Sequence, residues 1–194
     1  FHQKEVYAVK IIKKSNSLYA ITSGFDNKIA LYDIKKREII KSHTLDYKLQ
    51  FLATNPKKNH IAVCGNGRQI KIYDYNLNLI KTISSQTVPA GLAYKGDYLV
   101  SGSGTSPINI NTYKVSNDYS LHSSFKEHDN LTMAVAFLDT DTVVSGGGDN
   151  NEIYIWNKDT TKVVKKTAGV GNTVWSVGID GDKVAWGNTW TQTK

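Results

Sequence analysis

Two glycine-rich segments are the first places in this sequence where chemistry could occur, because backbone amides in such segments can hold a phosphate group. They are Ser101-Gly102-Ser103-Gly104-Thr105 and Gly146-Gly147-Gly148. A phosphate loop of the Walker type continues into Lys-Ser or Lys-Thr and begins a helix. Neither segment does so, and we therefore interpret both as hairpin turns.

Acidic side chains suggest a calcium site as a second possibility. Asp139-Thr140-Asp141 and Asp180-Gly181-Asp182 each bring two carboxylates close together. Calcium takes roughly six to eight oxygen ligands, and no third ligand group lies near either pair. The five histidines show no metal-ligand spacing, and we interpret His60 and His122 as surface or strand residues. The sequence therefore predicts neither a metal ion nor another cofactor.

The single cysteine, Cys64, excludes a disulfide within the chain and a zinc site made of several cysteines. It lies in the apolar run Ile61-Ala62-Val63-Cys64, which predicts a small buried side chain and not a reactive thiol. This cysteine content fits a protein of the cell interior, and we expect an intracellular, cytoplasmic location.

The composition is that of a globular protein. Of the 194 residues, 40% are hydrophobic and 21% are charged, which disfavours disorder. No apolar run approaches the roughly 18 residues of a membrane span. The net charge of +7 permits an acidic partner without requiring one. Because the chain begins with Phe1 and not with Met, we expect it to be a fragment or a processed piece.

A repeat of about forty residues organises the chain. His2 and His43, which open the first two units, are 41 residues apart, and His128 follows His43 after 85 residues, about two periods. At the other end of the units, Asp33 and Asp74 are again 41 residues apart. A period of about 40–45 residues that holds four short strands is typical of one propeller blade.

The segments within each unit read as strands. They are short and rich in Val, Ile, Tyr and Thr, and Gly, Asn and Asp bound them. Asn66-Gly67 is the strongest hairpin signal, because both residues tolerate a positive φ. Gly96-Asp97, Asp139-Thr140-Asp141 and Gly181-Asp182 mark the first turn of units three, four and five. No convincing amphipathic helix is present, and the sequence predicts an all-β fold.

Three features make the chain resemble the WD-repeat family: a His that opens a unit, a Ser/Thr-Gly…Asp hairpin, and an aromatic-acidic pair that closes the third strand. The pair appears as Tyr32-Asp33, Tyr73-Asp74 and Trp156-Asn157. The resemblance implies a β-propeller of four-stranded antiparallel blades, incomplete in this chain, with repeats at about 1–42, 43–84, 85–127, 128–168 and, incompletely, 169–194. The remaining blades would come from missing sequence or another chain, since open strand edges promote aggregation.

The resemblance also implies a structural hydrogen-bond network within a blade. Its members are the opening His, a Ser or Thr of the second strand, a turn Asp and an aromatic residue of the third strand. In unit one these are His2, Thr22, Asp26 and Tyr32, and in unit four they are His128, Ser145, Asp149 and Trp156. A His–Asp–Ser set has the composition of a hydrolytic triad, but its recurrence in separate blades favours a structural role. Tyr32 supplies a hydroxyl where Trp156 supplies an N–H, so the two networks must differ.

Because strands in a blade alternate in direction, the first and third turns of every blade share one face. In units one and two these turns carry a basic face, made by Lys13, Lys14, Lys35, Lys36, Arg37, Lys57 and Lys58. One interpretation is an ordinary solvated surface. The other is a site for an anionic partner: an acidic protein, nucleic acid or a phospholipid head group.

The opposite face offers a second candidate for partner binding. Aligning the first strands places five residues at one position, which often lines a docking site in WD-repeat proteins: Tyr7, Lys48, Pro89, Met133 and Trp175. Phe25 and Trp190 lie in or near turns on the same face. Tyr, Trp and Met are enriched in the cores of interfaces, although packing in the protein core is the competing explanation.

The resemblance implies a non-catalytic scaffold for protein–protein interaction, part of a larger multidomain protein or complex. The alternative is a module that binds nucleic acid or anionic lipid through its basic face. A catalytic propeller is disfavoured, because the sequence has no cofactor motif or metal cluster. Other proteins are therefore the expected partners, and this inference depends on the family resemblance, since a fold alone does not fix a function.

Overall fold

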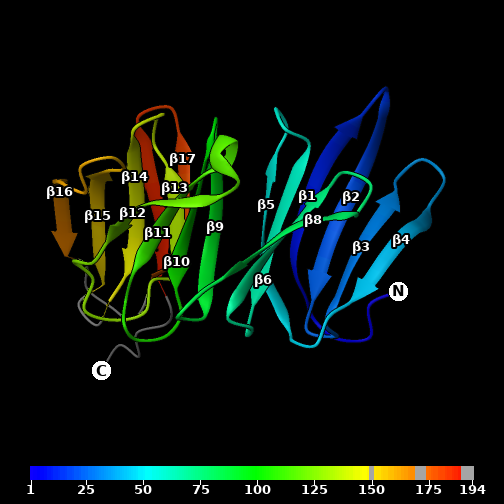
Figure 1. Cartoon of the computed structure of the whole chain (residues 1–194), viewed down its shortest axis with the longest axis horizontal. Helices are drawn as coiled ribbons and strands as arrows, with labels where there is room; N and C mark the ends of the chain where they lie inside the picture. The colour runs from blue at the N-terminus through cyan, green and yellow to red at the C-terminus, as the bar shows by residue number, and fades with distance from the viewer. Residues whose placement is uncertain (149–150, 169–173, 189–194) are drawn as a thin grey trace. The chain divides into compact units, whose positions relative to one another are not determined.

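The structure is a computed structural model that describes residues 1–148, 151–168 and 174–188 (Figure 1). The chain divides into two compact units, Phe1–Pro89 and Ala90–Lys194. The regular structure of both units consists of strands. The described part of the chain also contains one short 3₁₀ helix, η1 (Val115–Asn117).

The first unit contains two four-stranded antiparallel sheets, each with its strands in sequence order. The first sheet consists of β1 (Val6–Lys14), β2 (Ser17–Gly24), β3 (Lys28–Asp33) and β4 (Glu38–Thr44). The second sheet consists of β5 (Leu49–Asn55), β6 (His60–Gly65), β7 (Gln69–Asp74) and β8 (Leu79–Ser84).

The second unit repeats this arrangement. Its third sheet consists of β9 (Pro89–Lys95, beginning at the unit boundary), β10 (Tyr98–Ser103), β11 (Ile110–Lys114) and β12 (Ser120–Phe125). The fourth sheet consists of β13 (Ala134–Phe137), β14 (Thr142–Gly147), β15 (Glu152–Asn157) and β16 (Val163–Ala168). A two-stranded sheet follows, β17 (Val174–Asp180) with β18 (Lys183–Asn188). The predicted all-β fold of four-stranded antiparallel sheets is confirmed.

The two glycine-rich segments lie mostly in strands, so their interpretation as hairpin turns is wrong for most of their length. Ser101–Ser103 end β10, and Gly146 and Gly147 end β14. At Gly102 and Gly147 the reason for glycine is close approach, whereas Gly148 is a turn residue with a φ of 76°. A Cβ on Gly102 would collide with the Thr132 carbonyl oxygen, and one on Gly147 with the Leu131 carbonyl oxygen.

Asn66-Gly67 does connect two strands, β6 and β7, as the sequence predicts. The predicted reason is wrong, because neither residue is among those with a positive φ. Instead the Tyr47 ring covers Gly67, where a Cβ would come within 2.6 Å of the ring atom Cδ1. The predicted turns at Gly96 and Gly181 do use the left-handed region, with φ of 57° and 59°.

Each unit is held together by apolar side chains between neighbouring sheets. In the first unit, Ile12, Ile21 and Leu31 pack with Leu49 and other side chains of the second sheet. These four residues are at most 2% exposed. The opposite side of β1 is open, and Val9 and Ile11 there are more than half exposed. Burial between sheets therefore stabilises each unit, whereas the strand ends and turns remain accessible.

The second unit is built on the same plan. Val100, Ile110 and Phe125 of the third sheet share a buried cluster with Phe137, Val143 and Trp156 of the fourth sheet. On the other side of the fourth sheet, Val144 and Ile153 pack with Val174 of β17. The fourth sheet is thus covered on both faces, and its middle strands β14 and β15 are almost continuously buried.

We predict that the substitution Gly147→Ala lowers the free energy of unfolding by about 2 kcal/mol, because overpacking against fixed backbone typically costs about 1–3 kcal/mol. Gly178→Ala is the matched control in the same unit, since nothing lies within 4 Å of its Cβ and its φ is ordinary. The control is expected to be neutral or slightly stabilising. Urea unfolding of both variants measures the difference, and equal free energies would contradict the packing.

Candidate functional site

Three buried side chains form a hydrogen-bonded chain in the fourth sheet. The Trp156 Nε1–H donates to Ser145 Oγ over 3.0 Å, and this oxygen lies 2.9 Å from Nε2 of His128. Burial lowers the pKa of His128 to about 4, while Asp129 raises it and Lys166 lowers it by smaller amounts. The imidazole is therefore neutral near pH 7, and its Nε2 can accept the proton of the Ser145 hydroxyl.

This network also ties two sheets together. Phe125, at the end of β12 in the third sheet, stacks on Trp156 with ring centroids 4.5 Å apart and an interplanar angle of 10°. Phe125 also meets the His128 ring edge to face at 6.0 Å. Asp149, the fourth predicted member of this network, lies outside the described residues. A hydroxyl as completely buried as that of Ser145 cannot reach a substrate.

The first sheet brings together His2, Thr22 and Asp26 in a related way. Nε2 of His2 lies 2.8 Å from Thr22 Oγ1, and Nδ1 lies 2.9 Å from Asp26 Oδ1. The Asp26 carboxylate also accepts backbone N–H groups of Gln3 and Lys28. Burial raises the pKa of Asp26, but the hydrogen bonds from His2, Gln3 and Lys28 outweigh this effect and hold the pKa below its usual value. The N-terminal segment is thereby fixed to the β2–β3 turn.

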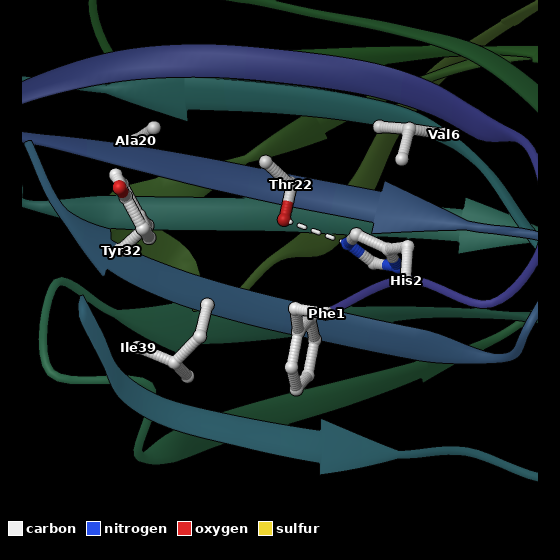
Figure 2. Close-up of a pocket in the computed structure, with 7 residues that line it drawn as sticks. All are labelled: Phe1, His2, Val6, Ala20, Thr22, Tyr32 and Ile39. Atoms are coloured by element: carbon white, nitrogen blue, oxygen red, sulfur yellow. Dashed lines mark hydrogen bonds between the residues drawn. The ribbon is translucent and has the colours of Figure 1, made fainter. Parts of the chain in front are cut away.

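Tyr32, the fourth predicted member in the first sheet, does not complete this network. Among the described residues, no hydrogen bond joins its hydroxyl to Thr22. A pocket of about 370 Å³ opens there instead (Figure 2), lined by Phe1, His2, Val6, Ala20, Thr22, Tyr32 and Ile39. Its lining is mostly apolar, so it suits an apolar side chain better than a charged ligand.

The residues proposed for docking in the first unit form one exposed cluster, which we call the aromatic patch: Tyr7, Phe25 and Lys48. The rings of Tyr7 and Phe25 stack with centroids 4.1 Å apart and an interplanar angle of 12°. The Lys48 Nζ lies 4.9 Å from the centroid of the Phe25 ring. Tyr7 is 51% exposed and Lys48 is exposed as well.

A recurring β-bulge positions Tyr7. The register shifts between Val6 and Ala8 in β1, and the same shift occurs around Gln50 in β5 and around Trp175 in β17. Such a bulge re-aims the extra side chain away from the regular alternation of the strand. The predicted alignment of Lys48 with Tyr7 is therefore wrong by two residues, and Gln50 holds the equivalent position. Lys48 is instead equivalent to Glu5, because the Lys48 carbonyl accepts the Asn66 backbone N–H as the Glu5 carbonyl accepts that of Phe25.

The other residues proposed for docking are more scattered. Met133 and Pro89 are half-buried and buried, respectively, whereas Trp175 is 49% exposed. Trp190 lies outside the described residues. The structure thus gathers the aromatic residues of the first unit into a patch and leaves Trp175 as a separate exposed position in the second unit.

The residues of the predicted basic face lie at the β1–β2, β3–β4 and β5–β6 turns of the first unit. Because the strands alternate in direction, these turns are at the end of the sheets opposite the β2–β3 turn that carries Phe25 (Figure 1). All seven cations are exposed apart from Lys14, which is half-buried and bonds to Asn76.

The comparison with protein families adds a sequence match to this geometry. The family model described as WD domain, G-beta repeat matches residues 119–157. This segment of the chain matches a WD repeat. The matched segment begins just before β12 and ends with β15, so the WD repeat contains Phe125, His128, Ser145 and Trp156. The resemblance to the WD-repeat family is confirmed over these residues.

A comparison with solved structures extends the match to the fold of nearly the whole chain. The crystal structure of the computationally designed Ika8 protein aligns with a TM-score of 0.80 at 20% identity. The alignment covers 96% of this chain and 56% of that chain, so this chain spans little more than half the length of the designed protein. The search of curated proteins found no match. The predicted fold class, an incomplete β-propeller of four-stranded blades, is confirmed.

Sequence reasoning missed an ionic cluster between the third and fourth sheets. The Lys158 side chain, 4% exposed, makes ion pairs of 2.9 Å with Asp141 and Asp159. Its Nζ also lies 4.3 Å from the Tyr98 ring centroid. Burial lowers the pKa of Lys158, but the hydrogen bonds to the two carboxylates outweigh it and raise the pKa above its usual value. The sequence does not predict this cluster, because only the packing of the sheets brings Tyr98 close to Lys158 and the two aspartates.

Two kinds of feature are absent from the described residues. In the described ranges 1–148, 151–168 and 174–188, no group of three or more His, Cys, Asp or Glu is placed to hold a metal ion. The same residues include no helix with the length and apolar character needed to cross a membrane.

We predict that Ser145→Ala lowers the free energy of unfolding by about 1–3 kcal/mol, because it leaves the buried Trp156 N–H without an acceptor. Trp156→Phe removes the donor instead, at an additional cost in packing. A double-mutant cycle by urea unfolding separates the two effects. The double variant is expected to lose less than the sum of the single variants, and strict additivity would show that the hydrogen bond contributes nothing.

Proposed function

We propose that this chain is a non-catalytic scaffold that binds other proteins, as part of a larger protein or complex in the cell interior. The aromatic patch of Tyr7, Phe25 and Lys48 is the observation that carries this proposal. The match to the WD repeat supports it, because this family supplies interaction scaffolds. The complete burial of Ser145 supports a structural role, and not a catalytic one, for the His and Ser residues of the hydrogen-bond network.

The aromatic patch has the properties of an interface anchor. Tyr is enriched among the residues that dominate binding energy, and a half-exposed ring still has area to bury. The patch is also held in place before binding. The bulge fixes Tyr7, and the Phe25 backbone N–H donates to the Glu5 carbonyl over 2.9 Å. Little conformational entropy is therefore lost when a partner covers the stacked rings.

The charge of the patch indicates the chemistry of its partner. Lys48 is exposed and lies over the Phe25 ring, where its ammonium group keeps donors for a second acceptor. A partner with an apolar side chain beside a carboxylate would complement both the rings and the cation. Trp175 occupies the same bulge position in the second unit and is a separate docking position in this proposal.

We predict that the double substitution Tyr7→Ala and Phe25→Ala removes bound partners from the purified full-length chain. In direct titration, the affinity of the chain for a recovered partner is expected to fall by at least about tenfold, because an aromatic anchor contributes about 1–4 kcal/mol to binding. Leu18→Ala with Leu79→Ala is the control, because these side chains of the same unit are 50% and 53% exposed and lie beside the β1–β2 and β7–β8 turns, at the end of the sheets opposite the patch. Unchanged melting temperatures establish that all variants are folded.

The control is expected to keep the partners, and Trp175→Ala is expected to weaken them less than the double variant. Partners that remain bound to the Tyr7 and Phe25 variant with unchanged affinity would overturn the aromatic patch as the docking site. Substitution of Lys48 by Glu tests the carboxylate on the partner, because like charges would then face each other.

A further inference from the structure

The end of the first unit opposite the aromatic patch concentrates exposed positive charge without matching negative charge. We call this surface the basic end; it is formed by Lys13, Lys14, Lys35, Lys36, Arg37, Lys57 and Lys58. At this end of the first unit the exposed acid is Glu38, which lies 3.6 Å from Lys36 as a surface ion pair. Such an exposed pair is weak, so it neutralises little of the surrounding field.

The carboxylates of the other acidic residues at this end accept hydrogen bonds from the backbone of their own turns. Asp33 is 4% exposed, and its carboxylate accepts the Lys36 backbone N–H over 2.9 Å. The Asp74 carboxylate accepts the backbone N–H groups of Asn76 and Asn78, each over 2.8 Å. Burial raises the pKa of Asp74, but the bonds from Asn78 and Asn76 outweigh it and lower the pKa below its usual value. These carboxylates stabilise the backbone and leave the lysine side chains to solvent.

The turns are also rigid platforms for the charges. Arg37 and Asn59 take left-handed conformations with φ of 59° and 55°, which close the β3–β4 and β5–β6 turns tightly. Asn55 Oδ1 accepts the backbone N–H groups of Lys57 and Lys58 over 3.1 and 3.3 Å. The basic end is therefore a row of fixed, protruding turns, and it presents its cations without a folding cost on binding.

We propose that the basic end rests on the surface of an acidic phospholipid bilayer. Six of its seven cations are lysines, which act as point charges in the diffuse field of anionic head groups. Ile34, 39% exposed, and Leu18, 50% exposed, lie on the same turns and offer apolar contacts at the head-group boundary. Recognition of single-stranded nucleic acid would use aromatic stacking platforms in a groove. Here the cations lie on protruding turns, and Ile34 and Leu18, the exposed apolar side chains beside them, are aliphatic.

The proposal is compatible with simultaneous binding of a protein partner. Tyr7 lies near the beginning of β1 and Lys13 near its end, six residues apart. At about 3.3 Å per residue the two surfaces are separated by roughly 20 Å along the strand. A chain bound to lipid through the basic end would therefore present the aromatic patch away from the bilayer.

Co-sedimentation of the full chain with vesicles tests the proposal, using phosphatidylcholine with and without phosphatidylserine at low and high salt. We predict salt-sensitive binding to the acidic vesicles only. The test variant carries Lys13→Gln, Lys35→Gln and Lys58→Gln, one substitution in each turn. Each lysine near an acidic surface contributes about fivefold to affinity, so the triple variant is expected to bind about 100-fold more weakly.

The matched control carries Lys4→Gln, Arg68→Gln and Lys126→Gln, which remove the same charge from exposed residues outside the basic end. The control and the Tyr7 and Phe25 double variant are expected to bind vesicles as the wild type does, which separates this proposal from the protein-docking site. Absent binding at low salt, or equal losses in test and control variants, would overturn it. Binding to RNA or DNA that the test variant loses, while vesicle binding is unaffected, would assign the basic end to nucleic acid instead.

Discussion

The need of each sheet to bury its apolar faces governs the rest of this structure. A single four-stranded sheet of this sequence would expose side chains such as Ile21, Leu31, Ile61 and Val63, all of which are at most 1% exposed when the sheets pack together. Burying each such side chain contributes about 1.5–3 kcal/mol, and no isolated strand pairing supplies a comparable amount. Because the sheet faces are used for packing, only strand ends, turns and the open sides of edge sheets are left for partners.

The close approach of neighbouring strands places the surfaces described above. In three of the sheets a glycine at the end of the second strand stands against a backbone carbonyl in the segment that leads into the first strand: Gly24 against Glu5, Gly65 against Lys48, and Gly147 against Leu131. The bulge that follows in β1, β5 and β17 re-aims one side chain of the first strand. In β1 this close approach accompanies the bulge that fixes the direction of Tyr7. The proposed docking position is a consequence of the same local geometry in both units.

Sequence alone predicted the fold class because its signals are local and repeated. The period between His2 and His43, the Gly-Asp turns and the β-branched segments all depend on residues close together in the chain. The hydrogen bonds of His128 with Ser145 and of Ser145 with Trp156 join residues expected from the WD-repeat resemblance. The stacking of Tyr7 on Phe25 was within reach of the same reasoning, since both residues were placed on one face.

What the sequence could not provide depended on register and on long-range packing. A single bulge shifts the alignment of Lys48, and no residue type announces a bulge in advance. Gly67 resembled a turn glycine, although the Tyr47 ring is the reason for it. The buried Lys158 looked like another surface lysine, because its partners Asp141 and Tyr98 are brought to it only by packing of one sheet on the next.

Hydrogen exchange of a Leu49→Ala variant tests most directly whether packing between sheets holds the first unit together. Leu49 lies in β5, is fully buried and shares a cluster with Ile21 and Leu31 of the neighbouring sheet. The cavity is expected to cost about 2–5 kcal/mol and to accelerate exchange of the Ile21 and Leu31 amides by a corresponding factor. Acceleration confined to β5 and β6, with β2 and β3 unchanged, would contradict the account.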